Sequence, residues 1–200
     1  MWCIGGPAIS ICEEIMGKFL DLLLTFSQKR RSVFFRVIML LSGGAVFLVI
    51  VPLVLAGLGG VVSRLIGINW PRYVEVIIAI SFTGTGLFFC AWTVASQWFV
   101  GKGTPVPISP PQKLIVAGPY KLCRNPLQFG VVLYYLGIVT LLISLTAGLF
   151  ASLAALIIGS LYHKLVEEKE LLLRFGEDYK NYRTRTPFIF PVQLPKSWLV

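Results

Sequence analysis

Two short polar clusters flank a long uncharged stretch in the second half of the chain, and both carry side chains that can do chemistry. The first contains Arg124 and Asn125, and the second contains His163, Glu167 and Glu168. A guanidinium such as that of Arg124 binds a carboxylate through paired hydrogen bonds and stays charged. An imidazole such as that of His163 can serve as a general base. These residue types are suited to binding an anionic group and to acid–base chemistry.

Each of these side chains also has a purely structural interpretation. Arg124 can be a topology-setting arginine that extends its charge to the membrane surface. Glu167 and Glu168 can form a solvated helix face, in which Glu168 pairs with Lys164 four residues earlier. His163 can be an interfacial side chain. Because adjacent helical residues diverge by about 100°, only Glu167 continues the His163 face, and we expect the two glutamates to do different jobs.

The composition indicates that membrane-spanning helices position these clusters. The chain has 200 residues, of which 56% are hydrophobic and 14% charged, with a mean hydropathy of +0.80. Three stretches contain no Lys, Arg, Asp or Glu: 37–63, 76–101 and 125–163. A spanning helix needs about 20 apolar residues, so these stretches supply one, one and two passes. The sequence therefore predicts an all-α integral membrane protein with four transmembrane helices.

The first half of the chain supplies helices but no chemical motif. Residues 9–27 have a helical composition with four charges, which predicts either an interfacial helix or a fifth span. Two spans follow within 33–98, the first with Pro52 as a predicted kink and Arg36 snorkelling at its end. The glycines at 57–60 and 84–86 lack the spacing of a dinucleotide-binding motif, and we interpret them as helix-packing residues.

The segment 127–166 must fold back on itself. As one helix it would be about 60 Å long, twice the hydrocarbon thickness. Ser144, Thr146 and Gly148 are predicted to mark the turn of a tight helical hairpin. The hairpin would bring the loop before it next to the residues that follow it, and so unite the two polar clusters. The helix is predicted to continue to Phe175, with Gly176 in a left-handed conformation at its end.

The charge distribution predicts the topology and the partners. The net charge is +9, and the basic residues flank the apolar runs, which favours contact with anionic headgroups of the bilayer over nucleic acid. By the positive-inside rule, the loop 99–126 and the tail 167–200 of this single membrane domain are expected in the cytoplasm. The four cysteines are then expected to be free thiols, and the single histidine offers no metal-site pattern.

Five elements in fixed order resemble the isoprenylcysteine carboxyl methyltransferase family, which belongs to a wider group that includes the membrane phospholipid methyltransferases. They are G-P-Y at 118–120, R-x-P at 124–126, the paired glutamates 167–168, F-G-x-x-Y-x-x-Y at 175–182 and a terminal proline at 191. The resemblance covers roughly residues 100–191. It implies an S-adenosylmethionine-dependent methyltransferase with a cytoplasmic cofactor pocket and a lipid-like substrate that arrives from the bilayer. Asn125 stands where the family often has histidine.

The chemistry of the side chains, weighed without the resemblance, suggests roles for these residues and for their neighbours. One glutamate would bind the cofactor and the other would brace Arg124, and Tyr179 and Tyr182 would either cap the pocket or anchor at the headgroups. The segment 113–120 would wrap the adenosine; the alternative, a proline-rich linker, better describes 104–111. The predicted catalytic residues are Arg124, Asn125 and Glu167; the cofactor-binding residues are Lys113, Leu114, Val116, Gly118, Pro119, Tyr120, His163 and Glu168; the substrate-binding residues are Arg124, Tyr179 and Tyr182.

The expected reaction is methyl transfer to the carboxylate of a lipidated, prenylcysteine-like substrate at the cytoplasmic membrane face. A carboxylate is ionised at neutral pH, so such an enzyme needs alignment more than a base. Two alternatives stay open: N-methylation of a phospholipid amine, whose ammonium must first lose a proton, and a non-enzymatic membrane scaffold that binds lipid and has no cofactor affinity.

Overall fold

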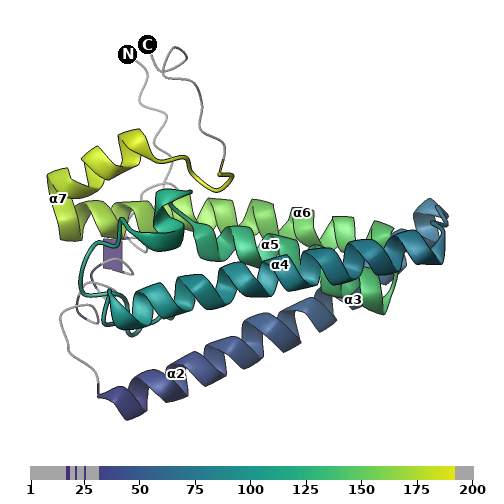
Figure 1. Cartoon of the computed structure of the whole chain (residues 1–200), viewed down its shortest axis with the longest axis horizontal. Helices are drawn as coiled ribbons and strands as arrows, with labels where there is room; N and C mark the ends of the chain where they lie inside the picture. Colours follow the sequence, from purple (N-terminus) through teal and green to yellow (C-terminus); the bar gives the residue numbers. More distant parts are fainter. Residues whose placement is uncertain (1–16, 19–20, 22–24, 26–31, 192–200) are drawn as a thin grey trace.

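The computed structural model describes residues 17–18, 21, 25 and 32–191, so the predicted helix over 9–27 lies almost wholly outside the described residues. The described chain is a bundle of helices without strands (Figure 1). Its elements are α2 (Val33–Ala45), the π-turn η1 (Val46–Ile50), α3 (Val51–Ile66), α4 (Arg72–Phe99), the 3-10 turn η2 (Gly118–Lys121), α5 (Pro126–Leu142), α6 (Leu145–Tyr162), the π-turn η3 (His163–Glu167) and α7 (Glu168–Arg185).

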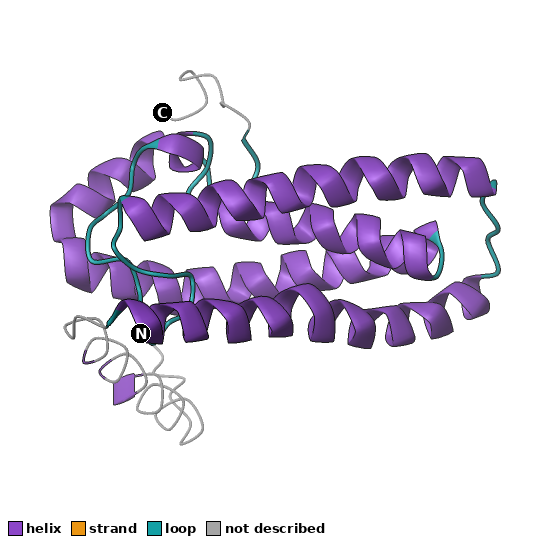
Figure 2. Ribbon diagram, turned by 60° about the horizontal axis from the view of Figure 1, so that its bottom comes forward, coloured by secondary structure: helices purple, strands orange, loops and turns teal. Residues whose placement is uncertain are grey.

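The bundle confirms the predicted all-helical membrane fold. Three continuous helical stretches, Val33–Ile66, Arg72–Phe99 and Leu145–Arg185, are long and apolar enough to cross a bilayer. Helix α5 is apolar but has only 17 residues, about 25 Å, and packs between α4 and α6. Three to four helices of the described chain can therefore span the membrane. The connections between helices lie at the two ends of the bundle (Figure 2).

Helices α5 and α6 form the predicted tight hairpin. Its turn consists of Ile143 and Ser144, and the Ser144 hydroxyl accepts a hydrogen bond of 3.2 Å from the Ala147 N–H at the start of α6. Thr146 and Gly148, predicted to mark the turn, instead lie in the first turns of α6. Gly148 is needed for packing, because a Cβ there would collide with Thr140.

Glycines let α4 and α5 approach almost backbone to backbone. A Cβ at Gly86 would lie 2.7 Å from the Gly130 carbonyl oxygen, and one at Gly137 would lie 2.7 Å from the Ala79 carbonyl oxygen. The prediction that the 84–86 glycines serve packing is therefore right for Gly86 and wrong for Gly84, which has open space around it. Gly130 and Gly137 were not predicted as contact positions.

The π-turn η1 accommodates Pro52, the residue predicted to kink the first span. Proline has no N–H to offer the Leu48 carbonyl, and the wider π-turn also leaves the Phe47 carbonyl without a helical donor. The Tyr134 hydroxyl donates to the Leu48 carbonyl at 2.8 Å, and the Tyr135 hydroxyl donates to the Phe47 carbonyl at 2.7 Å. Unpaired carbonyls cost several kcal/mol in hydrocarbon, so these two hydroxyls stabilise the distorted helix.

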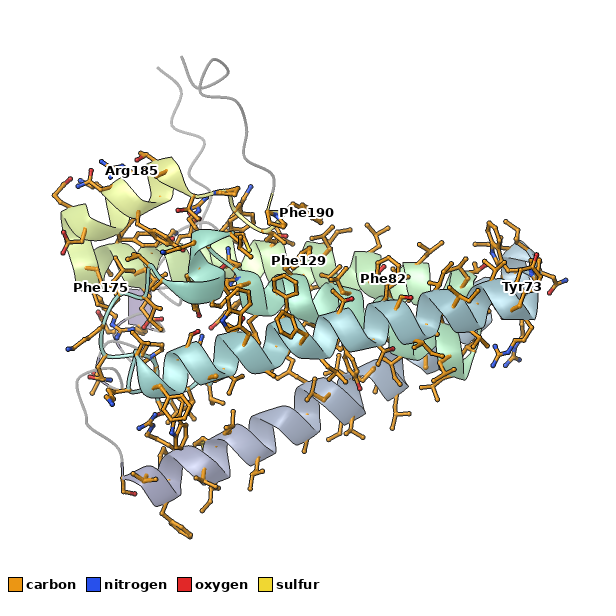
Figure 3. The ribbon with its side chains drawn as sticks, in the orientation of Figure 1. Tyr73, Phe82, Phe129, Phe175, Arg185 and Phe190 are labelled. Carbon is orange, nitrogen blue, oxygen red and sulfur yellow. The ribbon has the colours of Figure 1, made fainter. Side chains whose placement is uncertain are left out.

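The two ends of the bundle differ in the residues that form them. One end, the polar end, is formed by residues 100–125 and 163–191; it includes Phe175 and Arg185, whereas Tyr73 lies at the opposite end (Figure 3). At the opposite end the Glu75 carboxylate accepts a hydrogen bond of 2.8 Å from the Leu145 N–H and pairs with Arg72 at 3.2 Å.

At the polar end, the prediction that Arg36 snorkels is wrong. Arg36 is buried, donates to the carbonyls of Trp98 and Gly103 at 3.2 and 3.1 Å, and stacks 4.0 Å above the Trp98 ring. It therefore fixes α2 to the start of the loop between α4 and α5.

Candidate functional site

The G-P-Y sequence at 118–120 forms hydrogen bonds to both α4 and α7, and so links these two helices in space. Gly118 has a φ of 62°, which favours glycine, and Pro119 then starts the 3-10 turn η2. The turn directs the Tyr120 hydroxyl to Gln97 of α4, whose amide nitrogen donates to it at 2.7 Å. The Tyr182 hydroxyl of α7 donates to the Tyr120 carbonyl at 2.7 Å. Gly118 and Pro119 are thus structural residues of this junction, and Tyr120 connects the two helices.

Asn125, predicted to be catalytic, holds the last described segment of the chain. Its backbone N–H and its side-chain amide both donate to the Phe188 carbonyl, at 3.1 and 3.0 Å. The Arg124 N–H donates to the Pro187 carbonyl at 2.8 Å. The neighbouring Phe190 packs edge to face on Phe129 of α5, with ring centroids 6.2 Å apart (Figure 3). The segment after α7 is therefore tied to the start of α5.

Arg124 and Glu168 form an ion pair at this place. Arg124 Nη1 lies 2.5 Å from Glu168 Oε1, and their side chains are only 13% and 16% exposed. Glu168 also lies 3.5 Å from Arg183, so it contacts two guanidinium groups and does not pair with Lys164 as the solvated-face interpretation required. Arg124 Nε is buried and has no hydrogen-bond partner among the described residues. This leaves a cationic donor with unused capacity next to a fixed carboxylate.

His163 and Glu167 form a second pair, through the imidazole Nδ1 and a carboxylate oxygen. Both belong to the π-turn η3, which connects α6 to α7. The Glu167 side chain is 37% exposed, whereas His163 is 15% exposed. The spacing prediction that Glu167 shares the His163 face therefore agrees with the geometry. A carboxylate on one ring nitrogen fixes the orientation and the tautomer of the imidazole.

Three tyrosines lie close enough to the two pairs to be influenced by their charges, and burial keeps the phenols neutral. Burial raises the pKa of Tyr179 to about 12, and the nearby Glu168 carboxylate adds to this, while the positive charge of Arg124 and a side-chain hydrogen bond with it act in the opposite direction. The pKa values of Tyr120 and Tyr182 are raised in the same way, mainly by burial. Tyr179 is 2% exposed, which excludes the predicted alternative of anchoring at the headgroups. These tyrosines act as hydrogen-bonding groups rather than as bases.

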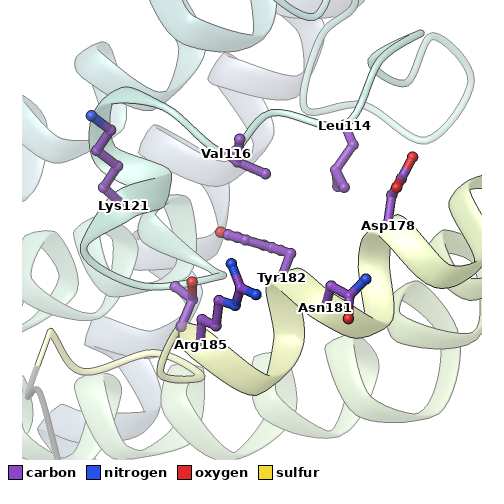
Figure 4. Close-up of a pocket in the computed structure, with 8 residues that line it drawn as sticks. Leu114, Val116, Lys121, Asp178, Asn181, Tyr182 and Arg185 are labelled. Carbon is purple, nitrogen blue, oxygen red and sulfur yellow. The ribbon is translucent and has the colours of Figure 1, made fainter.

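A pocket of about 550 Å³ lies beside this cluster, between the loop before η2 and the second half of α7 (Figure 4). Its volume is in the range of small-molecule sites. Leu114 and Val116 form one wall, and Tyr182 faces them from α7 (Figure 4). The lining residues are Leu114, Val116, Lys121, Asp178, Asn181, Tyr182, Arg185 and Thr186.

Only some of the residues predicted to bind the cofactor line this pocket. Leu114 and Val116 line it, whereas Lys113 is exposed outside it, and the Arg124–Glu168 and His163–Glu167 pairs are not among its lining residues. The α7 residues Asp178, Asn181 and Arg185 were missed. Their spacing of three and four residues, shared with Tyr182, places them on one helix face and is a signal that could have found them. Gly176 precedes this face and has a φ of 51°, the positive value predicted, but a second helical segment follows it.

The sequence of the region that contains this site matches a known protein family. The family model of the phospholipid methyltransferases matches residues 74–178, just over half of the chain. The chain belongs to the phospholipid methyltransferase family. Neither the curated proteins nor the solved structures contain a match to the chain.

Membership of this family indicates the general type of activity but not the particular substrate. The matched region extends from α4 through the first part of α7 and so contains the two polar pairs and the pocket wall at 114–116. The family implies methyltransferase activity on a lipid-like substrate in a bilayer. This favours an enzyme over the membrane scaffold considered from the sequence.

Proposed function

We propose that this protein transfers a methyl group from S-adenosylmethionine to the carboxylate of a lipidated, prenylcysteine-like substrate at the cytoplasmic face of the membrane. The observation that carries the proposal is the position of the partly unsatisfied Arg124 guanidinium beside a pocket of cofactor size, in a chain of a methyltransferase family. The carboxylate acceptor and the cofactor go beyond family membership and rest on the chemistry of these residues.

The pocket residues fit S-adenosylmethionine. Leu114 and Val116 offer an apolar surface for the adenine, and Asp178 offers a carboxylate for ribose hydroxyls or the ammonium group (Figure 4). Arg185 and Lys121 offer positive charge for the carboxylate of the cofactor. When bound, the cofactor supplies an electrophilic methyl group on its sulfonium. The residues of the chain would bind and orient it.

Arg124 would hold the acceptor. Glu168 fixes the guanidinium through Nη1, while the buried Nε lacks a protein partner. A buried donor without a partner is costly, and an acceptor oxygen at Nε would satisfy it. A carboxylate with a pKa near 4 is already a nucleophile at neutral pH, so alignment of the reactants can contribute about 7 to 11 kcal/mol without a general base.

A second candidate, N-methylation of a phospholipid amine, is favoured by the His163–Glu167 pair. An ammonium must lose a proton before it can attack, and a histidine oriented by a carboxylate is a suitable acceptor for that proton. In this case Arg124 would bind the phosphate of the headgroup.

Titration of the detergent-solubilised protein with S-adenosylmethionine tests the shared part of both candidates. We expect saturable binding in the wild type and a loss of about tenfold in Asp178→Ala and Asn181→Ala, because each removes a polar contact of the kind worth about 1.4 kcal/mol. Glu177→Ala is the matched control, since Glu177 lies on the same helix, pairs with Lys180 and does not line the pocket. Absence of wild-type binding would rule out the proposed cofactor.

A further inference from the structure

A largely buried arginine, Arg174, fixes the loop between α4 and α5 to α7. Arg174 lies between a carboxylate and a carbonyl: its Nη1 is 3.0 Å from Glu170 Oε1, and its Nη2 donates to the Pro111 carbonyl. The side chains of Arg174 and Glu170 are only 10% and 9% exposed. A buried ion pair contributes little to stability when its desolvation is counted, so its position calls for another explanation.

The contact with Pro111 is made where the loop closes. The Gln112 N–H donates to the Gly101 carbonyl at 2.6 Å, which shuts residues 101–112 into a closed loop. Arg36 holds the beginning of this loop through the Gly103 carbonyl. The chain leaves the closed loop directly into the pocket wall. Any shift at Pro111 is therefore passed to the wall residues that follow it.

Two contacts thus connect the opposing walls of the pocket. On one side Arg174 binds Pro111, three residues before Leu114; on the other side Tyr182 binds the Tyr120 carbonyl. Arg174 precedes Asp178 by four positions, with the bend at Gly176 between them, and Asp178 lies on the wall formed by α7. A guanidinium can make both bonds at once because its donors lie in a rigid plane.

We propose that Arg174, oriented by Glu170, is a positioning residue that sets the separation of the two pocket walls and thereby the affinity for the cofactor. This inference rests on the proposed function for the identity of the ligand. The connection of the 101–112 loop to α7 does not depend on the ligand and can be measured separately.

Three variants separate this role from that of an ordinary ion pair. Arg174→Met keeps the length of the side chain and removes both bonds, and Glu170→Gln removes the partner that orients the guanidinium. The exchange variant, Glu170→Arg with Arg174→Glu, retains an ion pair but places a carboxylate opposite the Pro111 carbonyl, to which it cannot donate. Lys180→Met is the control, because it breaks the exposed pair with Glu177 on the same helix.

The readouts are calorimetric binding of S-adenosylmethionine, KM and kcat in the methylation assay, and hydrogen–deuterium exchange of residues 101–117. We expect Arg174→Met and the exchange variant to bind the cofactor about tenfold more weakly, with KM rising and kcat nearly unchanged, and to exchange faster in that segment. Glu170→Gln should show the same changes to a smaller extent. Lys180→Met should behave as the wild type.

Two results would overturn the inference. The first is wild-type affinity in the exchange variant, which would show that only the ion pair matters. The second is wild-type exchange of residues 101–117 in Arg174→Met, which would show that the contact holds nothing in place. If the wild type itself fails to bind S-adenosylmethionine, the proposed function fails, and the exchange data still decide whether Arg174 positions the loop.

Discussion

Arg124 combines a fixed carboxylate partner with a buried donor that has no partner among the described residues. Glu168 contacts Nη1, the centroid of the Phe188 ring lies 5.4 Å from the guanidinium carbon, and Nε has no partner among the described residues. Glu168→Ala would leave the Arg124 guanidinium buried without an opposite charge beside it, which is strongly destabilising. Glu168→Gln is therefore the informative substitution at that position, and the arginine itself is best tested by lysine.

We predict that Arg124→Lys lowers kcat/KM for a carboxylate acceptor by about five- to 150-fold. Lysine retains the charge but loses the planar fork, at a cost of roughly 1 to 3 kcal/mol in transition-state binding. Steady-state kinetics on the purified protein measure it. Arg183→Lys provides the control, because Arg183 is 44% exposed and lies 3.5 Å from the same carboxylate. An unchanged kcat/KM in Arg124→Lys would show that Arg124 does not bind the acceptor and that it serves to set the topology.

A second prediction at this scale concerns Cys123. It is a free, fully buried thiol, and burial raises its pKa to about 11, although a hydrogen bond from the Asn125 backbone acts in the opposite direction. Because the thiolate is the reactive form and the raised pKa keeps the thiol protonated at pH 8, we expect no alkylation by iodoacetamide in the folded protein. Peptide mass spectrometry reads this out. Rapid modification under native conditions would contradict the packing of the loop before α5.

At the scale of elements, glycines determine how closely α4 and α5 approach, which leads to a stability prediction. A Cβ at Gly137 would lie 2.7 Å from the Ala79 carbonyl oxygen, so Gly137→Ala forces the helices apart and should destabilise the protein by about 1 to 3 kcal/mol. Gly84→Ala has open space around it and should leave stability unchanged. Thermal unfolding in detergent compares the two. Equal midpoints would mean that the α4–α5 contact is looser than described.

The helices and the site were predictable to different extents, for physical reasons. The spans followed from uncharged length, and the hairpin followed because one helix over 127–166 would be too long for the bilayer. The hairpin in turn predicted that Arg124 lies near the glutamates. The π-turn at Val46–Ile50 was not predictable, because it depends on hydroxyls of Tyr134 and Tyr135 more than 80 residues away.

The pocket face of α7 was missed because Asp178, Asn181 and Arg185 resemble an ordinary solvated face. Only the bend at Gly176 turns them toward the loop, and a sequence indicates that a glycine bends the chain without indicating where the chain goes next. Asn125 was assigned to catalysis from its motif position, whereas its amide holds Phe188. Motif spacing thus predicted which polar residues come together at this end of the bundle, but not what each of them contacts.

At the scale of the whole molecule, the loop 100–125 and the segment after α6 share one end of the bundle (Figure 1). We predict that cysteines introduced at Lys113 and Lys180, both exposed, are labelled from the same side of a sealed membrane. The excess of basic residues at this end favours the cytoplasm as that side. Labelling of the two positions from opposite sides would contradict the assembly of the site.

Whether the polar end methylates a carboxylate is decided by offering the protein a prenylcysteine analogue and an aminophospholipid in parallel. With labelled S-adenosylmethionine, initial rates are measured from about pH 6 to 8. The carboxylate is ionised throughout this range, so we predict transfer to the prenylcysteine analogue at a rate nearly independent of pH. Transfer to the aminophospholipid alone, at a rate that climbs with pH as an ammonium loses its proton, would contradict the claim and assign Arg124 to a headgroup phosphate.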